Sequence, residues 1–107
     1  MEKVERLMNE YRADDLGVAG VAETLAALSN GQAEEMLITK SAGDLKYDEA
    51  EVTNVLKSYG DTPAKLDHRT IADELIRRAT ELSSAQVTFI EDSSLLEPVG
   101  GVGAYRL

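Results

Sequence analysis

The stretch Gly17–Thr39 constrains the fold more than any other part of this chain, because it combines a helical pattern, a turn and a strand pattern. Its apolar residues at helical spacing predict one buried stripe: Val18, Val21, Leu25 and Leu28. Asn30-Gly31 is expected to end the helix, because glycine adopts the left-handed conformation of a C-terminal cap without steric cost. The continuous apolar run Met36–Ile38 predicts a strand covered on both faces. A helix leading into an interior strand indicates a layered fold.

The rest of the chain alternates helical and strand patterns. Helical spacing is found over residues 4–11, 48–60 and 67–82, and strand patterns over residues 85–90 and 102–107. Asp14 or Asp15 is expected to cap the helix that contains Val18, and Asp48 to cap the third helix. The strands at 36–38 and 85–90 are joined through helices, which suggests a crossover between strands of one sheet. The predicted fold class is a three-layer α/β/α sandwich with a mixed sheet of about four strands.

Two separated motifs carry a resemblance to a known family. The two motifs resemble the C-terminal domain of the archaeal and eukaryotic class I peptide chain release factor and Pelota family. The first is LMNE at residues 7–10 with GVAGVAETLAALSNGQAEEMLI at 17–38, and the second is VTFIEDSSLLEPVGGVGAYRL at 87–107. The likeness is strongest to the bacterial release-factor-like homologues of that family. It implies the α/β sandwich shared with kink-turn-binding ribosomal proteins. It also implies that residues 1–107 are a single domain, either excised from a longer protein or forming its C-terminal part.

Composition narrows the possible functions. The chain has 107 residues, which suits one domain. It has no cysteine, which excludes disulfides, thiolate metal sites and a cysteine nucleophile. The net charge of −9 opposes non-specific binding to phosphate backbones. No apolar run approaches the roughly 20 residues that span a bilayer, and the charged N-terminus is unlike a signal peptide. We therefore expect a cytoplasmic protein.

Several residues that could carry chemistry are better explained as structural. Asn30-Gly31-Gln32 resembles the Gly-Gly-Gln tripeptide of release factors, but it falls at a helix–strand turn, whereas the tripeptide lies in another domain of the family. The glycines at 100, 101 and 103 are expected to allow a close backbone approach. His68 is expected to be exposed or capping, and Ser93-Ser94 has no base nearby. The acidic residues Asp44, Asp48, Glu49 and Glu51 lack calcium-loop spacing. The sequence predicts no catalytic residue, no metal and no cofactor.

One basic pair also has a structural explanation. Arg77 and Arg78 each follow an acidic residue by one helical turn, Asp73 and Glu74 respectively. This acid-first spacing supports an exposed helix through ion pairs. It does not indicate a nucleic-acid interface.

The resemblance implies a non-catalytic protein-interaction module of a translation-termination or ribosome-rescue factor. In the family, this domain docks a translational GTPase or another ribosome-associated partner. An RNA-binding module of the kink-turn type is the alternative, and it is opposed by the acidic charge and the lack of a basic stripe. A stand-alone hydrolase is a third possibility, and no catalytic constellation supports it.

The interaction surface is expected in a loop, because regular elements use their apolar faces for the core. The predicted partner-binding residues are Glu91, Asp92, Leu95, Leu96 and Glu97. Adjacent leucines in an extended segment point in opposite directions, so one can pack inward while the other meets a partner. The competing interpretation is that both leucines close the core. A partner that approaches the acids is expected to be basic.

Overall fold

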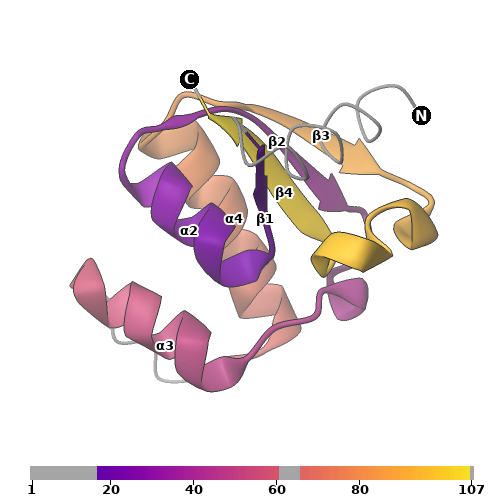
Figure 1. The fold of residues 1–107 in the computed structure, drawn as a ribbon, viewed down its shortest axis with the longest axis horizontal. Helices are drawn as coiled ribbons and strands as arrows, with labels where there is room; N and C mark the ends of the chain where they lie inside the picture. Colours follow the sequence, from indigo (N-terminus) through magenta and orange to yellow (C-terminus); the bar gives the residue numbers. More distant parts are fainter. Residues whose placement is uncertain (1–16, 61–65, 107) are drawn as a thin grey trace.

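The computed structural model describes residues 17–60 and 66–106 of the chain. Within them, four strands form one mixed sheet in the order β1-β4-β2-β3 (Figure 1). The strands are β1 (Gly17–Ala19), β2 (Ala33–Thr39), β3 (Gln86–Ile90) and β4 (Val102–Arg106). β2 and β3 are parallel, and β4 is antiparallel to both of its neighbours. Together with the helices, this mixed sheet confirms the predicted α/β fold class.

In residues 17–60 and 66–106, three helices lie on one side of the sheet, and we call this side the helical face. They are α2 (Val21–Ser29), α3 (Glu49–Ser58) and α4 (His68–Glu81). α2 and α4 lie side by side over the sheet, and α3 packs against α2 (Figure 1). Their apolar stripes and the helical face of the sheet form the larger core cluster, which includes Leu25, Leu28, Met36, Ile38, Val52, Leu56, Ile71 and Leu75.

A second, smaller core cluster lies on the opposite face of the sheet. It consists of Leu37, Ile90, Leu96, Val99 and Tyr105, with Ala19 and Leu95 packed against it. Met36 and Ile38 point to the helical face and Leu37 to the opposite face, because successive strand residues alternate. β2 is therefore covered on both faces, as its continuous apolar run predicts. The helix expected over residues 4–11 lies outside the described residues.

The expected start of the second helix is wrong. Val18 belongs to β1, where it pairs with Ala104 of β4, and the helix begins only at Val21. Gly20 separates the two elements with φ 90° and ψ 160°, which a helix cannot accommodate, and its N–H donates to the Val102 carbonyl at 3.0 Å. Gly20 occupies the N-cap position of α2, and the expected caps Asp14 and Asp15 lie outside the described residues. Val18 is nevertheless buried, but as a strand residue.

The turn at the end of α2 has the predicted structural role. The Gly31 N–H donates to the Leu28 carbonyl at 3.1 Å and the Gln32 N–H to the Ala27 carbonyl at 3.0 Å, which is the Schellman pattern. Gly31 has φ 67°, and a Cβ there would lie 3.2 Å from the Leu82 carbonyl oxygen. The interpretation of Asn30-Gly31-Gln32 as a structural turn is confirmed.

The helices α3 and α4 also begin where the sequence predicts. The Asp48 carboxylate accepts from the Glu51 N–H at 3.1 Å, and the Asp67 carboxylate accepts from the Thr70 N–H at 2.8 Å. Each side chain satisfies one of the free N–H groups of a helix N-terminus. His68, the first residue of α4, is exposed as expected.

The two neighbouring arginines of α4 have different environments, and the expectation of a wholly exposed pair is wrong. The side chain of Arg77 is 44% exposed and contacts Glu74 at 2.7 Å and Glu81 at 3.4 Å. The side chain of Arg78 is only 2% exposed, contacts Glu74 at 3.1 Å and donates to the Ser29 hydroxyl of α2. Burial lowers the pKa of Arg78, whereas the hydrogen bond and charge of Glu74 raise the pKa of Arg77. Arg78 thus joins α4 to α2.

Candidate functional site

The predicted partner-binding residues lie in the segment that follows β3, residues 91–101, which we call the acidic loop. It contains two short 3-10 turns, Ser93–Leu95 and Glu97–Val99. The segment that follows β2, residues 40–46, lies beside it, and we call it the β2 loop. Because β2 and β3 are parallel, both segments leave the sheet at the carboxyl ends of these strands. In open α/β sheets, ligands commonly bind just beyond the carboxyl ends.

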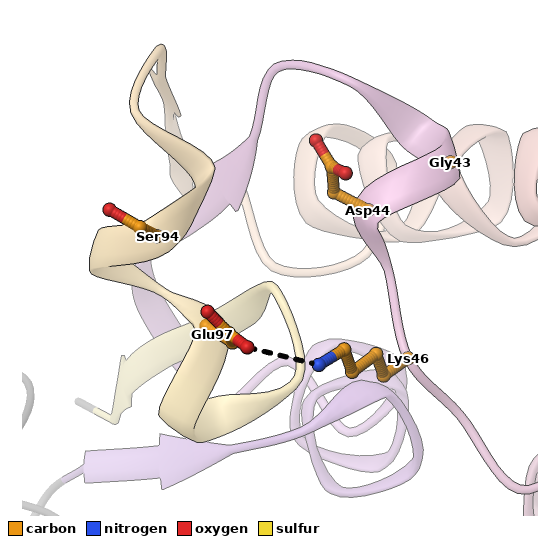
Figure 2. A pocket seen from close by; sticks show the side chains of 5 residues that line it. All are labelled: Gly43, Asp44, Lys46, Ser94 and Glu97. Atoms are coloured by element: carbon orange, nitrogen blue, oxygen red, sulfur yellow. Dashed lines mark hydrogen bonds and ion pairs between the residues drawn. The ribbon is translucent and has the colours of Figure 1, made fainter.

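A pocket of about 320 Å³ lies between the two loops (Figure 2). Its lining residues are Gly43, Asp44, Lys46, Ser94 and Glu97. Lys46 and Glu97 reach toward each other from the two walls and meet at 3.4 Å. Both side chains are well exposed, so this ion pair contributes little stability and can open to admit a polar group.

The structure separates the predicted residues by exposure. Glu91, Asp92 and Glu97 are exposed, and Leu95 is partly buried. Leu96 has 0% of its surface exposed, because it packs into the opposite-face cluster. Its side chain therefore has no surface to offer a partner, and its place in the predicted set is corrected. A partner role for the other four residues stays a prediction.

Local hydrogen bonds fix the first turn of the acidic loop. The Asp92 carboxylate accepts from the Ser94 hydroxyl at 2.6 Å and from the Ser94 N–H at 3.1 Å. These bonds, that of the hydroxyl first, lower the pKa of Asp92, so its charge persists at neutral pH. Glu91 contacts Lys40 of the β2 loop at 3.7 Å, with both side chains largely exposed.

Glycines hold the two loops together through their backbones. The Lys46 N–H donates to the Gly100 carbonyl at 2.9 Å, and the Thr39 N–H donates to the Gly101 carbonyl at 2.8 Å. Gly101 has φ 92°, and a Cβ there would lie 3.1 Å from the Asp44 carbonyl oxygen. The expected close backbone approach at these glycines is confirmed, and it fixes the spacing between the walls of the pocket.

The side chains that were considered for nucleophilic chemistry have other partners in the structure. The Ser94 hydroxyl donates to Asp92, while the ring of His68 lies edge-on to that of Tyr47 at 5.3 Å between centroids. These groups do not form the serine, base and orienting acid of a nucleophilic site. In residues 17–60 and 66–106, no three histidine or acidic side chains are grouped so that they could hold a metal ion.

Sequence reasoning missed the β2 loop as half of the pocket. It rejected Asp44 as a ligand of a calcium loop and gave no role to Lys46. The sequence did contain the information needed to predict that the two loops are neighbours. A crossover between parallel strands at 36–38 and 85–90 places the segments that follow both strands at the same end of the sheet. Only the contact between Lys46 and Glu97 required the structure.

Comparison with known proteins supports the fold. No family model matches the chain, and no curated protein matches it. Among solved structures, the chain is similar to the Pelota protein of Thermoplasma acidophilum, with a TM-score of 0.58 and 15% sequence identity. The match covers 99% of this chain and 27% of the Pelota chain. The structure thus has a Pelota-like fold. No helix in the described part of the chain is long and apolar enough to span a membrane.

Proposed function

We propose that this chain is a non-catalytic protein-interaction domain of a translation-termination or ribosome-rescue factor. It docks a translational GTPase or another ribosome-associated protein in the cytoplasm. The observation that carries the proposal is the likeness to Pelota over 99% of this chain but only 27% of the Pelota chain. The extent of this match supports the interpretation of the chain as one domain of a larger factor, and the sequence resemblance points to the C-terminal domain.

The electrostatics of the site favour a basic protein partner over nucleic acid. Glu91, Asp92 and Glu97 are exposed in one loop, and the whole chain carries a net charge of −9. Phosphate backbones are repelled by such a surface, whereas basic side chains are attracted to it. The nearby lysines, Lys40 and Lys46, each already contact one of these glutamates.

The binding test uses this domain and a purified translational GTPase from the same organism. Association rates are measured against salt for the wild type and for the triple variant Glu91→Gln, Asp92→Asn, Glu97→Gln. We expect slower association and a flatter salt dependence for the variant, because exposed charges at an interface mainly steer the encounter. Failure of the wild-type domain to bind either the GTPase or ribosomes would overturn the proposal.

A matched control separates the site from overall charge. Glu23, Glu34 and Asp73 are exposed and lie in α2, β2 and α4. The variant Glu23→Gln, Glu34→Gln, Asp73→Asn removes the same charge away from the acidic loop. An equal effect of both triple variants would place the interface elsewhere. Binding of a kink-turn RNA at physiological salt would instead favour the RNA-binding alternative.

The non-catalytic part of the proposal has its own test. We expect the isolated chain to release no peptide from peptidyl-tRNA, because Asn30-Gly31-Gln32 serves as a helix-terminating turn. Turnover abolished by Gln32→Ala would assign this turn a catalytic role. Turnover that survives the substitution would reveal a site outside it. Either result would contradict the proposal.

A further inference from the structure

The outer edge of β3 carries backbone groups that no described strand satisfies. β3 is the last strand in the order β1-β4-β2-β3, so one of its two edges faces away from the sheet. The Ile90 carbonyl accepts from the Lys40 N–H at 3.0 Å, which directs the polar groups of Ile90 toward β2. Backbone groups alternate sides along a strand. The N–H and C=O groups of Val87 and Phe89 therefore face outward, and no other described strand pairs with them.

This edge lacks the features that normally prevent strands from pairing with other chains. Natural edge strands are protected by lysine, proline, bulges or very short length. The sequence of β3 is Gln-Val-Thr-Phe-Ile, without charge or proline, and its pairing with β2 is regular over five residues. The sheet edge formed by β1, in contrast, is only three residues long within the part of the chain that the structure describes. β3 is thus the edge that can accept an added strand.

An exposed aromatic ring lies at the same edge. Val87 and Phe89 pair in register with Met36 and Ile38, so their side chains point to the helical face. Val87 packs against the core there, but Phe89 is 51% exposed. An added strand would place a side chain directly beside this ring, and cross-strand contacts of aromatic residues stabilise sheets. Backbone and side chain therefore point to the same kind of ligand.

The charges next to the edge define the occupant. Glu91 and Asp92 directly follow β3, and the Glu91 side chain is 84% exposed. A strand added to β3 has one end beside these two carboxylates, where lysine or arginine would be attracted. A second copy of this chain would bring a further net charge of −9 to a contact only five residues long. The complementary occupant is a basic segment of a different protein.

We propose that the outer edge of β3 binds an extended, basic segment of another protein, which extends the sheet by one strand. The segment forms hydrogen bonds with Val87 and Phe89, covers the Phe89 ring with an apolar side chain and places a basic side chain at Glu91 and Asp92. This interaction shares Glu91 and Asp92 with the proposed partner surface, but its hydrogen bonds and its aromatic contact lie on the sheet edge, outside the pocket. Exchange of the Val87 and Phe89 amides reports on the edge alone, so failure of this proposal can be distinguished from failure of the proposed function.

Amide hydrogen exchange of the intact chain tests the proposal residue by residue. The probe is a synthetic nine-residue peptide of alternating valine and threonine with two lysines at one end. A second peptide with glutamates in place of the lysines tests the charge. We expect the basic peptide to slow exchange of the Val87 and Phe89 amides by at least about tenfold and the acidic peptide to bind more weakly. No slowing with the basic peptide, or slowing only at other amides, would overturn the proposal.

Two variants and a control make the result specific. Phe89→Lys places a charge on the edge, and we expect it to weaken peptide binding at least about tenfold. Leu82→Lys makes the same change at a similarly exposed residue, 48%, outside β3, and binding should be retained. Phe89→Pro removes the outward N–H, which an edge strand tolerates, together with the ring, and should also abolish binding while Ile90 stays protected. Equal binding by the Phe89 and Leu82 variants would overturn the proposal.

Exchange in the free chain distinguishes other occupants of the edge. We expect the Val87 and Phe89 amides to exchange faster than those of Thr88 and Ile90, whose polar groups face β2. Protection of Val87 and Phe89 that rises with protein concentration would assign the edge to a second copy. Protection independent of concentration would assign it to another part of the same chain. Either result would overturn the proposed binding of a different protein.

Discussion

Two segments with equally buried leucines are held in different ways, namely the helix–strand unit at residues 21–39 and the acidic loop at residues 91–101. Leu25 in the first and Leu96 in the second have no exposed surface. Leu25 lies on a helical stripe, so its place follows from residues three and four positions away. Leu96 has no such periodicity, and its side chain is buried in the cluster that contains Leu37 of β2 and Tyr105 of β4. Regular elements bury side chains by repetition, whereas this loop does so through contacts between distant segments.

The largest expected effect tests whether burial in the loop is energetically equal to burial in the regular elements. Leu25→Ala, Leu37→Ala and Leu96→Ala should each lower the free energy of unfolding by about 2–5 kcal/mol, because each removes a fully buried side chain and leaves a cavity. Denaturant unfolding of the purified variants measures this change. Unaltered stability of the Leu25 or Leu37 variant would contradict the helix–strand interpretation.

The adjacent leucine provides the control for the loop. Leu95 is only partly buried, so Leu95→Ala should cost clearly less than Leu96→Ala. Both leucines pack on the same cluster, so equal losses at the two positions would mean that full and partial burial in the loop contribute equally to stability. In that case, the difference in burial would have no energetic consequence.

The second prediction compares two glycines with similar backbone angles, one at each segment. Gly20 has φ 90° with open space where a Cβ would lie, whereas Gly101 has φ 92° and a Cβ there would contact Asp44 and Leu45. Gly20→Ala should cost about 1–3 kcal/mol from backbone strain alone. Gly101→Ala should cost more, because the β2 loop must also move. Thermal unfolding of both variants measures the difference, and a smaller loss at Gly101 would contradict the close packing of the loops.

A third prediction concerns the contact that joins α4 to the helix–strand unit. Arg78→Ala should lower the free energy of unfolding by about 1–3 kcal/mol, because it removes charged hydrogen bonds to Glu74 and Ser29 in a buried position. Arg77→Ala should change it by less than about 1 kcal/mol, because exposed ion pairs contribute little. Chemical denaturation of both variants makes the comparison. Similar losses would show that burial does not separate the two arginines.

The same contrast explains which features the sequence could predict. The end of α2 at Gly31 and the starts of α3 and α4 at Asp48 and Asp67 depend on residues close in sequence, and all three were predicted correctly. β1 was missed because three residues carry no periodicity, and Gly17–Ala19 become a strand only by pairing with β4. The spacing of charges on a helix likewise cannot show that Ser29 of another helix covers Arg78.

The candidate site shows the same limit. The acids at 91, 92 and 97 were predicted to be available because they lie in a loop, and their exposure agrees. The inward position of Leu96 could not be derived, since an extended segment of two adjacent leucines allows either one to point inward. The pairing of Lys46 with Glu97 also depends on tertiary packing. Residue type and loop position thus predict which side chains are exposed, whereas the tertiary fold determines which of them contact one another.

The smallest expected effect concerns a part of the acidic loop that is held locally. Asp92 should titrate below the ordinary aspartate value of 3.8, because the Ser94 hydroxyl and then the Ser94 N–H stabilise its charged form. Ser94→Ala should raise the pKa of Asp92 toward 3.8 without restoring it fully, since the N–H bond remains. NMR titration of the Asp92 carboxyl carbon measures both values, and Ser58→Ala, which alters an exposed serine of α3, should leave them unchanged.

The sign of the pH dependence follows from the direction of this shift. A carboxylate whose folded-state pKa is below its unfolded value stabilises the fold fully above the unfolded value and loses that contribution as the pH falls through the folded value. The difference in stability between the wild type and Asp92→Asn should therefore shrink as the pH is lowered from about 4. The prediction is contradicted if the stability difference between the wild type and Asp92→Asn grows on acidification, or if Ser94→Ala leaves the pKa of Asp92 unchanged. Either result would show that long-range contacts, and not the hydrogen bonds from Ser94, determine the pKa of Asp92. Tertiary packing would then control the exposed end of the acidic loop as well as its buried end.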